Sequence, residues 1–93
     1  PTARFGLAYS LHRAGDLEVA ESAYLALIEG HPDHAAALNN LADVLHKQGC
    51  YDRAREVARR ALEVARREQP GLTQAIRETL NEIPAGGDAR RCH

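Results

Sequence analysis

The sequence predicts an all-α protein of about five helices, arranged as two helical hairpins followed by one capping helix. Three observations predict this class. Helix-forming alanine, leucine, arginine and glutamate dominate the 93 residues, whereas aromatic residues make up only 4%. The apolar residues recur at helical rather than strand spacing. The chain also repeats itself with a period of 34 residues, which is long enough for two short helices and their turns.

The repeat aligns residues 1–34 with residues 35–68 without a gap. The alignment contains eight identities, namely Ala3/Ala37, Leu7/Leu41, Ala8/Ala42, Leu11/Leu45, His12/His46, Gly15/Gly49, Ala20/Ala54 and Glu29/Glu63. Most of these residues are small or apolar and lie at helical spacing. The repeat is therefore expected to be architectural, with each unit forming the same pair of helices.

Each unit is predicted to form two helices separated by a glycine. Gly15 and Gly49 end the first helices, because glycine adopts the left-handed capping conformation without a steric penalty. Asp16 is expected to cap one second helix, and Asp52 to cap the other or lie in its first turn. The residues expected to face inward are Leu7, Ala8, Leu11, Leu41, Ala42 and Leu45 in the first helices, and Val19, Ala20, Ala23, Tyr24, Leu27, Ala54, Val57, Ala58, Ala61, Leu62 and Ala65 in the second.

Residues 29–34 connect the two units, with Pro32 ending one helix and Asp33 placed to start the next. A capping helix is predicted over residues 70–83, followed by a flexible tail at residues 84–93. The apolar stripe of this helix comprises Leu72, Ala75, Ile76, Thr79, Leu80 and Ile83. The predicted domain therefore covers residues 1–83.

Composition excludes several classes of protein. A formal net charge of -1 argues against nucleic-acid binding, and no apolar run is long enough to suggest a membrane span. Cys50 and Cys92 are far apart in sequence, and the second lies in the expected tail, so no disulfide is predicted. The chain begins at Pro1, which indicates an excised domain or a processed product. Its compartment stays open between cytoplasm and periplasm.

The two units resemble the tetratricopeptide repeat (TPR) family, whose pattern is W-x2-L-G-x2-Y, a mid-repeat glycine, A-x3-F, A and P. The matching residues are Leu7, Ala8, Leu11, Gly15, Ala20, Tyr24, Leu27 and Pro32 in unit one, and Leu38, Leu41, Ala42, Leu45, Gly49, Tyr51, Ala54 and Ala61 in unit two. Arg4, Ala58 and Arg66 depart from the family at its tryptophan, phenylalanine and proline places. The last departure predicts that this helix continues towards Glu68.

The resemblance covers about residues 2–83 and implies a right-handed α-solenoid. Its first helices would line a concave face that binds peptides or partner helices. Chaperone-binding members of the family carry a carboxylate clamp of lysine, asparagine and arginine on this face. The clamp places here hold Phe5, Tyr9, Asn40, Pro70 and Gln74. Only Asn40 matches, so chaperone carboxylate ligands are not expected.

Helical geometry and the family analogy place a set of candidate binding residues on the concave face. They are Phe5, Tyr9, His12, Arg13, Asn39, Asn40, Asp43, His46 and Lys47, with Thr73 and Arg77 from the last helix. The aromatic stripe Phe5–Tyr9–His12 has three open interpretations: packing on a preceding repeat or domain, anchoring a bound peptide, or idle exposure. Two interpretations stay open for Asn39 and Asn40. Either they bond to the local backbone or are exposed to solvent, or they hydrogen-bond to the backbone of a ligand, for which Asn40 is the stronger candidate.

The predicted function is a non-catalytic protein–protein interaction module, part of a larger bacterial protein. The alternative is a scaffold for self-association or for docking a neighbouring domain, for example a peptidase. No enzyme is predicted, because Cys50 has no paired histidine or oxyanion site in the sequence pattern. No metal or cofactor is predicted either. His12 and His46 hold the same place in successive units, but helices packed roughly 8–10 Å apart would have to move before both could bind one ion.

Overall fold

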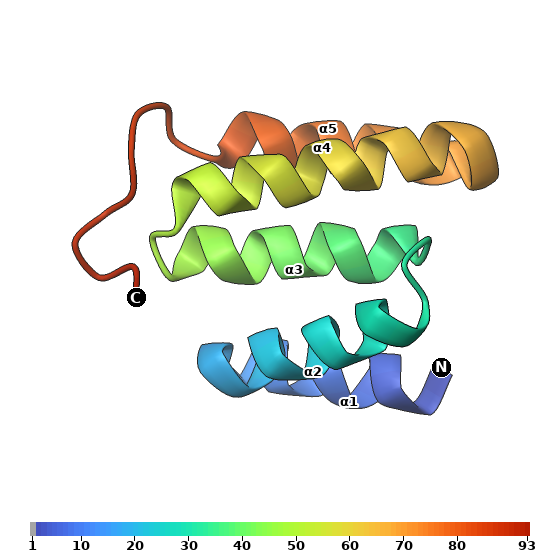
Figure 1. The fold of residues 1–93 in the computed structure, drawn as a ribbon, viewed down its shortest axis with the longest axis horizontal. Coiled ribbons are helices and arrows are strands. Elements are labelled where there is room, and N and C mark those ends of the chain that lie inside the picture. Colours follow the sequence, from blue (N-terminus) through green and yellow to red (C-terminus); the bar gives the residue numbers. More distant parts are fainter. Residues whose placement is uncertain (1) are drawn as a thin grey trace.

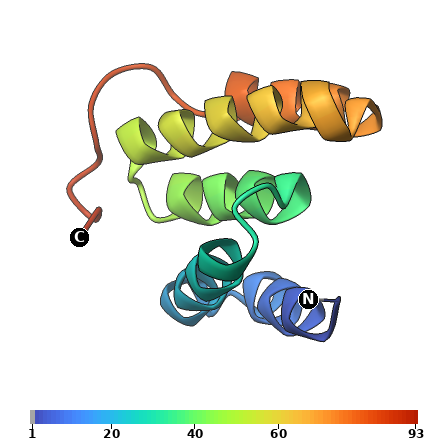
Figure 2. The same cartoon turned by 45° about the vertical axis from the view of Figure 1, so that its right-hand side comes forward.

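The computed structural model describes residues 2–93, which form five α-helices, one 3₁₀ turn and no strand. The helices are α1 (Thr2–Ala14), α2 (Leu17–Gly30), α3 (Ala35–Lys47), α4 (Tyr51–Glu68) and α5 (Thr73–Glu82), with the 3₁₀ turn η1 (Pro70–Leu72) before α5. Successive helices run antiparallel, and α3 lies between α2 and α4 (Figure 1). The first hairpin is turned relative to the second (Figure 2). The all-α prediction is confirmed.

The turns inside the two hairpins follow the sequence prediction. Gly15 and Gly49 have φ values of 86° and 82°, the left-handed conformation that glycine tolerates. The predicted helix starts are only partly correct. Asp16 lies at the N-cap position of α2 but makes no side-chain capping bond. His34, rather than the expected Asp33, caps α3, because its Nδ1 accepts a hydrogen bond from the Ala37 N–H at 3.1 Å.

The core comprises two clusters of buried side chains between the helices. The larger cluster contains Ala8, Ala20, Tyr24, Leu27, Ala37, Leu41, Ala42, Val44, Leu45, Cys50, Ala54, Ala58 and Ile83. The smaller contains Ala35, Leu38, Ala61, Val64, Ala65 and Ile76, and joins α5 to α3 and α4. Ala20 and Ala54 are fully buried, as expected for small residues where paired helices pack closely.

Three of the residues predicted to face inward are exposed. Leu7 is 62% exposed although its repeat counterpart Leu41 is only 2% exposed. α3 packs against both α2 and α4, whereas α1 packs mainly against α2, and this difference in neighbours accounts for the exposure of Leu7. Val19 and Ala75 are also exposed, on the outer sides of α2 and α5. An apolar stripe thus predicted that each segment is helical, but it did not predict whether a neighbouring helix buries each residue of the stripe.

The second half of the chain differs from the prediction mainly at its end. α4 does continue to Glu68, as the missing proline indicated. The predicted capping helix is shorter than residues 70–83, because residues 70–72 form the 3₁₀ turn. Residues 84–93, expected as a flexible tail, leave α5 and pass along the turn between α3 and α4 (Figure 1). The expectation of no disulfide was wrong, since Cys50 and Cys92 are bonded across a separation of 42 residues.

Candidate functional site

The face formed by α1 and α3 brings several of the predicted binding residues together. His12 of α1 and Asp43 of α3 meet across the two repeats, with 2.7 Å between His12 Nε2 and Asp43 Oδ2. Lys47, one turn further along α3, donates to the same carboxylate oxygen. The other ring nitrogen of His12 lies 3.3 Å from the Tyr24 hydroxyl on α2. These four side chains form a polar network that links three helices, and it is called the α1–α3 network below.

The chemistry of these side chains fixes the direction of the hydrogen bonds. An ionised carboxylate only accepts, so His12 Nε2–H donates to Asp43. In the neutral ring, Nδ1 then accepts from the Tyr24 hydroxyl. The His12 side chain is only 8% exposed. Both of its nitrogens are engaged, so His12 acts as a cross-repeat tie rather than as a free ligand group.

Burial and charge set the protonation states in the α1–α3 network. Burial raises the pKa of Tyr24 to about 12, against a smaller opposing effect of the Asn40 side chain, so its hydroxyl stays protonated. Burial alone would also raise the pKa of Asp43. The hydrogen bonds from Lys47 and His12, together with the positive charge of Lys47, outweigh this, and the pKa of Asp43 lies below its ordinary value. Asp43 is therefore a carboxylate at neutral pH.

The predicted aromatic stripe divides into an engaged part and an open part. The Phe5 ring stacks on His34, with 5.2 Å between centroids, and also approaches Tyr24. Phe5 is half-buried and contributes to packing between α1 and the connector before α3. Tyr9 is 42% exposed, and its hydroxyl accepts from Arg13 Nη1 at 3.4 Å. Tyr9 is thus the residue of the stripe that a partner can reach.

Of the remaining predicted residues, Asn40 borders the α1–α3 network, and the others make no contact with it that the described residues show. Asn39 Oδ1 is covered and has no hydrogen-bond partner within the described residues. Asn40 lies beside Tyr24, where it contributes to the tyrosine's environment. His46 points towards α4, with its ring edge-on to Tyr51 at 5.9 Å. Arg77 is exposed on α5, and Thr73 is engaged locally with the carbonyl of residue 70.

Two open depressions lie at opposite ends of the helices. One, of about 390 Å³, borders the α1–α3 network and is lined by His12, Arg13, Gly15, Leu17 and Lys47. The other, of about 570 Å³, lies between the connector and the end of α4, and its lining residues are Gly30, His31, Pro32, Asp33, His34, Glu68 and Gln69. Sequence reasoning missed the second depression, because the connector was interpreted only as a turn.

A second polar cluster was also missed by sequence reasoning. Glu21 on α2 is buried, and its carboxylate accepts from Gln48 Nε2 at 3.1 Å and lies 3.5 Å from Arg53 Nη1. His93 Nε2 approaches the same carboxylate at 3.5 Å. A glutamate within an apolar helix face was the available signal. Burying a charge is costly unless it is paired, so the buried Glu21 requires these partners.

Comparison with protein families identifies the architecture. A family model described as tetratricopeptide repeat matches residues 5–73. The chain belongs to the tetratricopeptide repeat family. The match runs from Phe5 in α1 through both TPR hairpins and η1 to the first residue of α5, and it agrees with the helical repeat architecture described above. Comparisons with curated proteins and with solved structures gave no match for this chain.

Among residues 2–93, no helix is long and apolar enough to cross a membrane. No group of three or more histidine, cysteine, aspartate or glutamate side chains in that range is arranged to hold a metal ion. TPR repeats generally mediate protein–protein interactions, and the family is a non-catalytic interaction module.

Proposed function

We propose that this domain binds an extended peptide segment of a protein partner across the face formed by α1 and α3. The observation that carries the proposal is the exposure of Tyr9, at 42%, in the middle of α1 with Arg13 beside it. Tyrosine and arginine are enriched among the residues that dominate binding energy in protein interfaces. A peptide side chain packed on the Tyr9 ring would bury apolar surface that is now open to water.

The surroundings of Tyr9 indicate which groups of the peptide would be recognised. Arg13 and Lys47 line the adjacent depression and present hydrogen-bond donors and positive charge. Peptide carbonyl groups or an acidic side chain would complement these donors. Apart from this depression, the covered amide oxygen of Asn39 on α3 has no donor among residues 2–93, and an unsatisfied buried acceptor costs roughly 1–3 kcal/mol. A peptide N–H that met this oxygen after a side-chain rotation would recover part of that cost.

The proposal is tested by selecting peptides from a displayed random library on the purified 93-residue chain. The best selected peptide is then titrated calorimetrically against three proteins: the parent chain, Tyr9→Ala, and Val19→Ala as the matched control on the exposed side of α2. Tyr9→Ala is expected to weaken binding about tenfold or more, which corresponds to roughly 1.4 kcal/mol or more. Val19→Ala should leave the affinity unchanged. Equal affinities for all three proteins would refute the proposal.

A second candidate function is supported by Leu7 on α1, which is 62% exposed although its counterpart Leu41 in α3 is buried. The side of α1 that carries Leu7 would serve as a scaffold surface for self-association or for docking a neighbouring domain. Concentration-dependent sedimentation of the parent chain and of Leu7→Asp tests the self-association version. Reversible dimerisation that Leu7→Asp abolishes would support it. A parent chain that stays monomeric over the whole range would remove it.

A further inference from the structure

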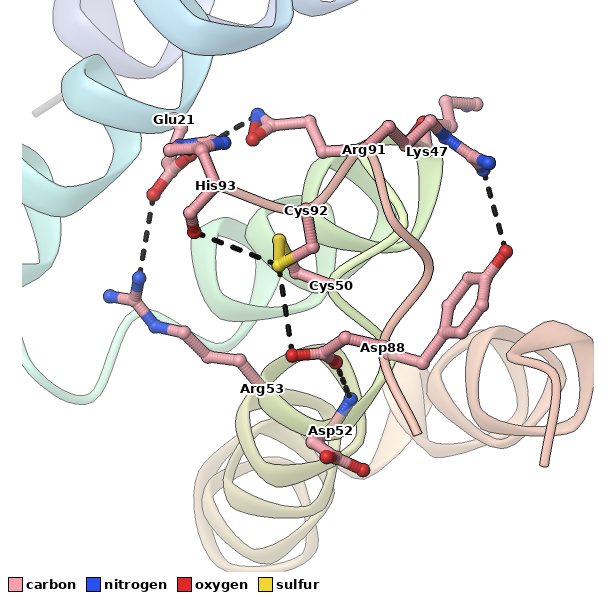
Figure 3. The surroundings of a disulfide bond; sticks show 11 residues. Glu21, Lys47, Cys50, Asp52, Arg53, Asp88, Arg91, Cys92 and His93 are labelled. Atoms are coloured by element: carbon pink, nitrogen blue, oxygen red, sulfur yellow. Dashed lines mark hydrogen bonds and ion pairs between the residues drawn. A yellow bond between two sulfur atoms is a disulfide. The ribbon is translucent and has the colours of Figure 1, made fainter. Parts of the chain in front are cut away.

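The C-terminal residues 84–93 are fastened to the turn between α3 and α4, and this segment is called the strap below. Cys92 in the strap is bonded to Cys50, the residue immediately before α4 (Figure 3). The strap leaves the C-terminal end of α5 and passes along the C-terminal end of α3 and the N-terminal end of α4 (Figure 1). It therefore joins the last helix to a turn that lies 42 residues earlier than Cys92 in the chain.

The strap fits the turn on which it lies. The Ala89 N–H donates to the Gly49 carbonyl at 2.8 Å. A Cβ atom at Gly49 would lie 2.8 Å from the Ala89 Cβ, so the strap uses the space that glycine leaves. Asp88 accepts from the Asp52 N–H at 3.0 Å and so caps α4, whose own N-cap residue Cys50 makes no side-chain capping bond.

Two arginines hold the strap at its ends. Arg55 on α4 donates to the backbone carbonyls of Pro84 and Gly86, the latter at 2.7 Å. Arg91 within the strap lies 3.4 Å from the Lys47 carbonyl and from the Tyr51 hydroxyl. These contacts lie at the surface, where a single hydrogen bond or ion pair contributes little to stability. The covalent bond is consequently the main restraint on the end of the strap.

The strap also reaches the first repeat. His93 Nε2 lies 3.5 Å from the carboxylate of Glu21 on α2, which Arg53 of α4 also contacts (Figure 3). Gln48, in the turn between α3 and α4, donates to the same carboxylate. Residues from α2, from the turn, from α4 and from the strap thus meet at one buried carboxylate. The disulfide holds this assembly closed at one end of the solenoid.

The two sulfur atoms differ in their access to solvent. Cys50 is buried, whereas Cys92 is only partly buried and lies in the exposed strap. An incoming thiolate therefore reaches Cys92 Sγ more readily. Cys50 is the favoured leaving group, because the N-terminus of α4 stabilises negative charge at the residue before it.

We propose that the Cys50–Cys92 bond is a redox modification site whose reduction releases the strap while the helices stay folded. The reductant is a dithiol, which supplies two electrons. One of its thiolates bonds to Cys92 Sγ, the Cys50–Cys92 bond breaks, and the electron pair leaves on Cys50 Sγ. The second thiolate of the reductant then attacks the reductant sulfur that is bonded to Cys92. This closes the disulfide of the oxidised reductant, breaks the mixed disulfide, and releases Cys92 as a thiolate. The products are two reduced cysteines, protonated from water as the pH requires, and one oxidised dithiol.

Release of the strap changes the end of the solenoid. The Gly49 carbonyl and the Asp52 N–H lose their partners in the strap and become open to solvent or to another chain. Glu21 loses His93 but keeps Gln48 and Arg53. The helices retain their own packing, because no residue of the strap other than Cys92 contributes to the two core clusters. The redox state of one bond therefore determines whether this end of the domain is covered.

The experiment uses the full 93-residue chain and dithiothreitol as the dithiol. Far-ultraviolet circular dichroism follows the helices, alkylation with iodoacetamide counts the free thiols, and limited trypsin digestion follows the strap through cleavage after Arg90 and Arg91. Before reduction, the chain should contain no free thiol and resist cleavage at these arginines. After reduction, both thiols should be alkylated, cleavage should become about tenfold faster or more, and the helical signal should remain.

Cys92→Ser provides the matched control, because it removes the bond and keeps the rest of the strap. It should be cleaved at the rate of the reduced parent chain, and dithiothreitol should not alter that rate. If Cys92→Ser does not fold, the reduced parent chain still gives the answer. Free thiols before reduction, a bond that resists dithiothreitol in the folded chain, an unchanged cleavage rate, or loss of the helical signal on reduction would each overturn the proposal.

Discussion

Leu7 and Leu41 occupy the same place in the two repeats, and replacing each with alanine isolates the contribution of a neighbouring helix. The substitution removes the equivalent of about three methylene groups, or roughly 2.4 kcal/mol at about 0.8 kcal/mol each, before any cavity is counted. Leu41 is 2% exposed, so the lost contacts and the cavity should together cost about 3 kcal/mol. Leu7 is 62% exposed and keeps only about two-fifths of its surface covered, so its loss should cost about 1 kcal/mol or less.

Urea unfolding followed by circular dichroism at 222 nm measures this difference directly. Helix propensity changes equally in both variants, so it cancels in the comparison. A difference of about 2 kcal/mol corresponds to a midpoint shift of about 1 M, since small domains lose roughly 1–3 kcal/mol per molar urea. The reasoning would be refuted if Leu7→Ala and Leu41→Ala lowered the free energy of unfolding equally, or if Leu7→Ala had the larger effect.

Two further predictions follow from the turn glycines and the α1–α3 network. The pKa of Asp43 lies below its ordinary value of 3.8, so the unfolded chain binds the proton more readily. The stability that Asp43 contributes is then complete above about pH 4 and is lost as the pH falls through the pKa of the folded state. The urea midpoints measured at about pH 5 and pH 3 should therefore differ less in Asp43→Asn than in the parent chain. Gly15→Ala and Gly49→Ala should each cost about 1–2 kcal/mol for the left-handed backbone. In urea unfolding, Gly49→Ala should lower the free energy of unfolding more than Gly15→Ala does, because a Cβ at residue 49 would lie 2.8 Å from the Ala89 Cβ. The difference between the two substitutions should disappear when both are made in the Cys92→Ser chain.

The architecture was predictable from sequence because its signals are periodic and local. The 34-residue repeat specified two equivalent hairpins, and Gly15 and Gly49 marked their turns at the residues that adopt positive φ. The exposure of Leu7 was not predictable in this way. An apolar stripe shows which side of a helix prefers burial, but only the arrangement of neighbouring helices decides whether that side is covered. Leu41 has such a neighbour, and Leu7 does not within residues 2–93.

The candidate site was predictable as a set of residues but not as an arrangement. His12 and Asp43 were both placed on the concave face, yet their bond depends on how far one repeat is rotated and shifted relative to the next. The disulfide depends on long-range geometry in the same way. The separation between Cys50 and Cys92 says nothing about distance in space until α5 returns the chain to the turn before α4. Contacts between repeats are therefore the part that sequence periodicity leaves open.

The strap and the proposed peptide site meet at Lys47, so the strength of that connection decides whether one affects the other. Arg91 approaches the Lys47 carbonyl at 3.4 Å, while the Lys47 side chain pairs with Asp43 in the α1–α3 network. A long, exposed hydrogen bond of this kind is worth at most about 1 kcal/mol, which corresponds to about a fivefold change in affinity. Reducing the disulfide should therefore change the affinity of a selected peptide by less than about fivefold in calorimetric titration. A larger change would mean that strap release moves α1 or α3, because the single contact at Lys47 is too weak to transmit it.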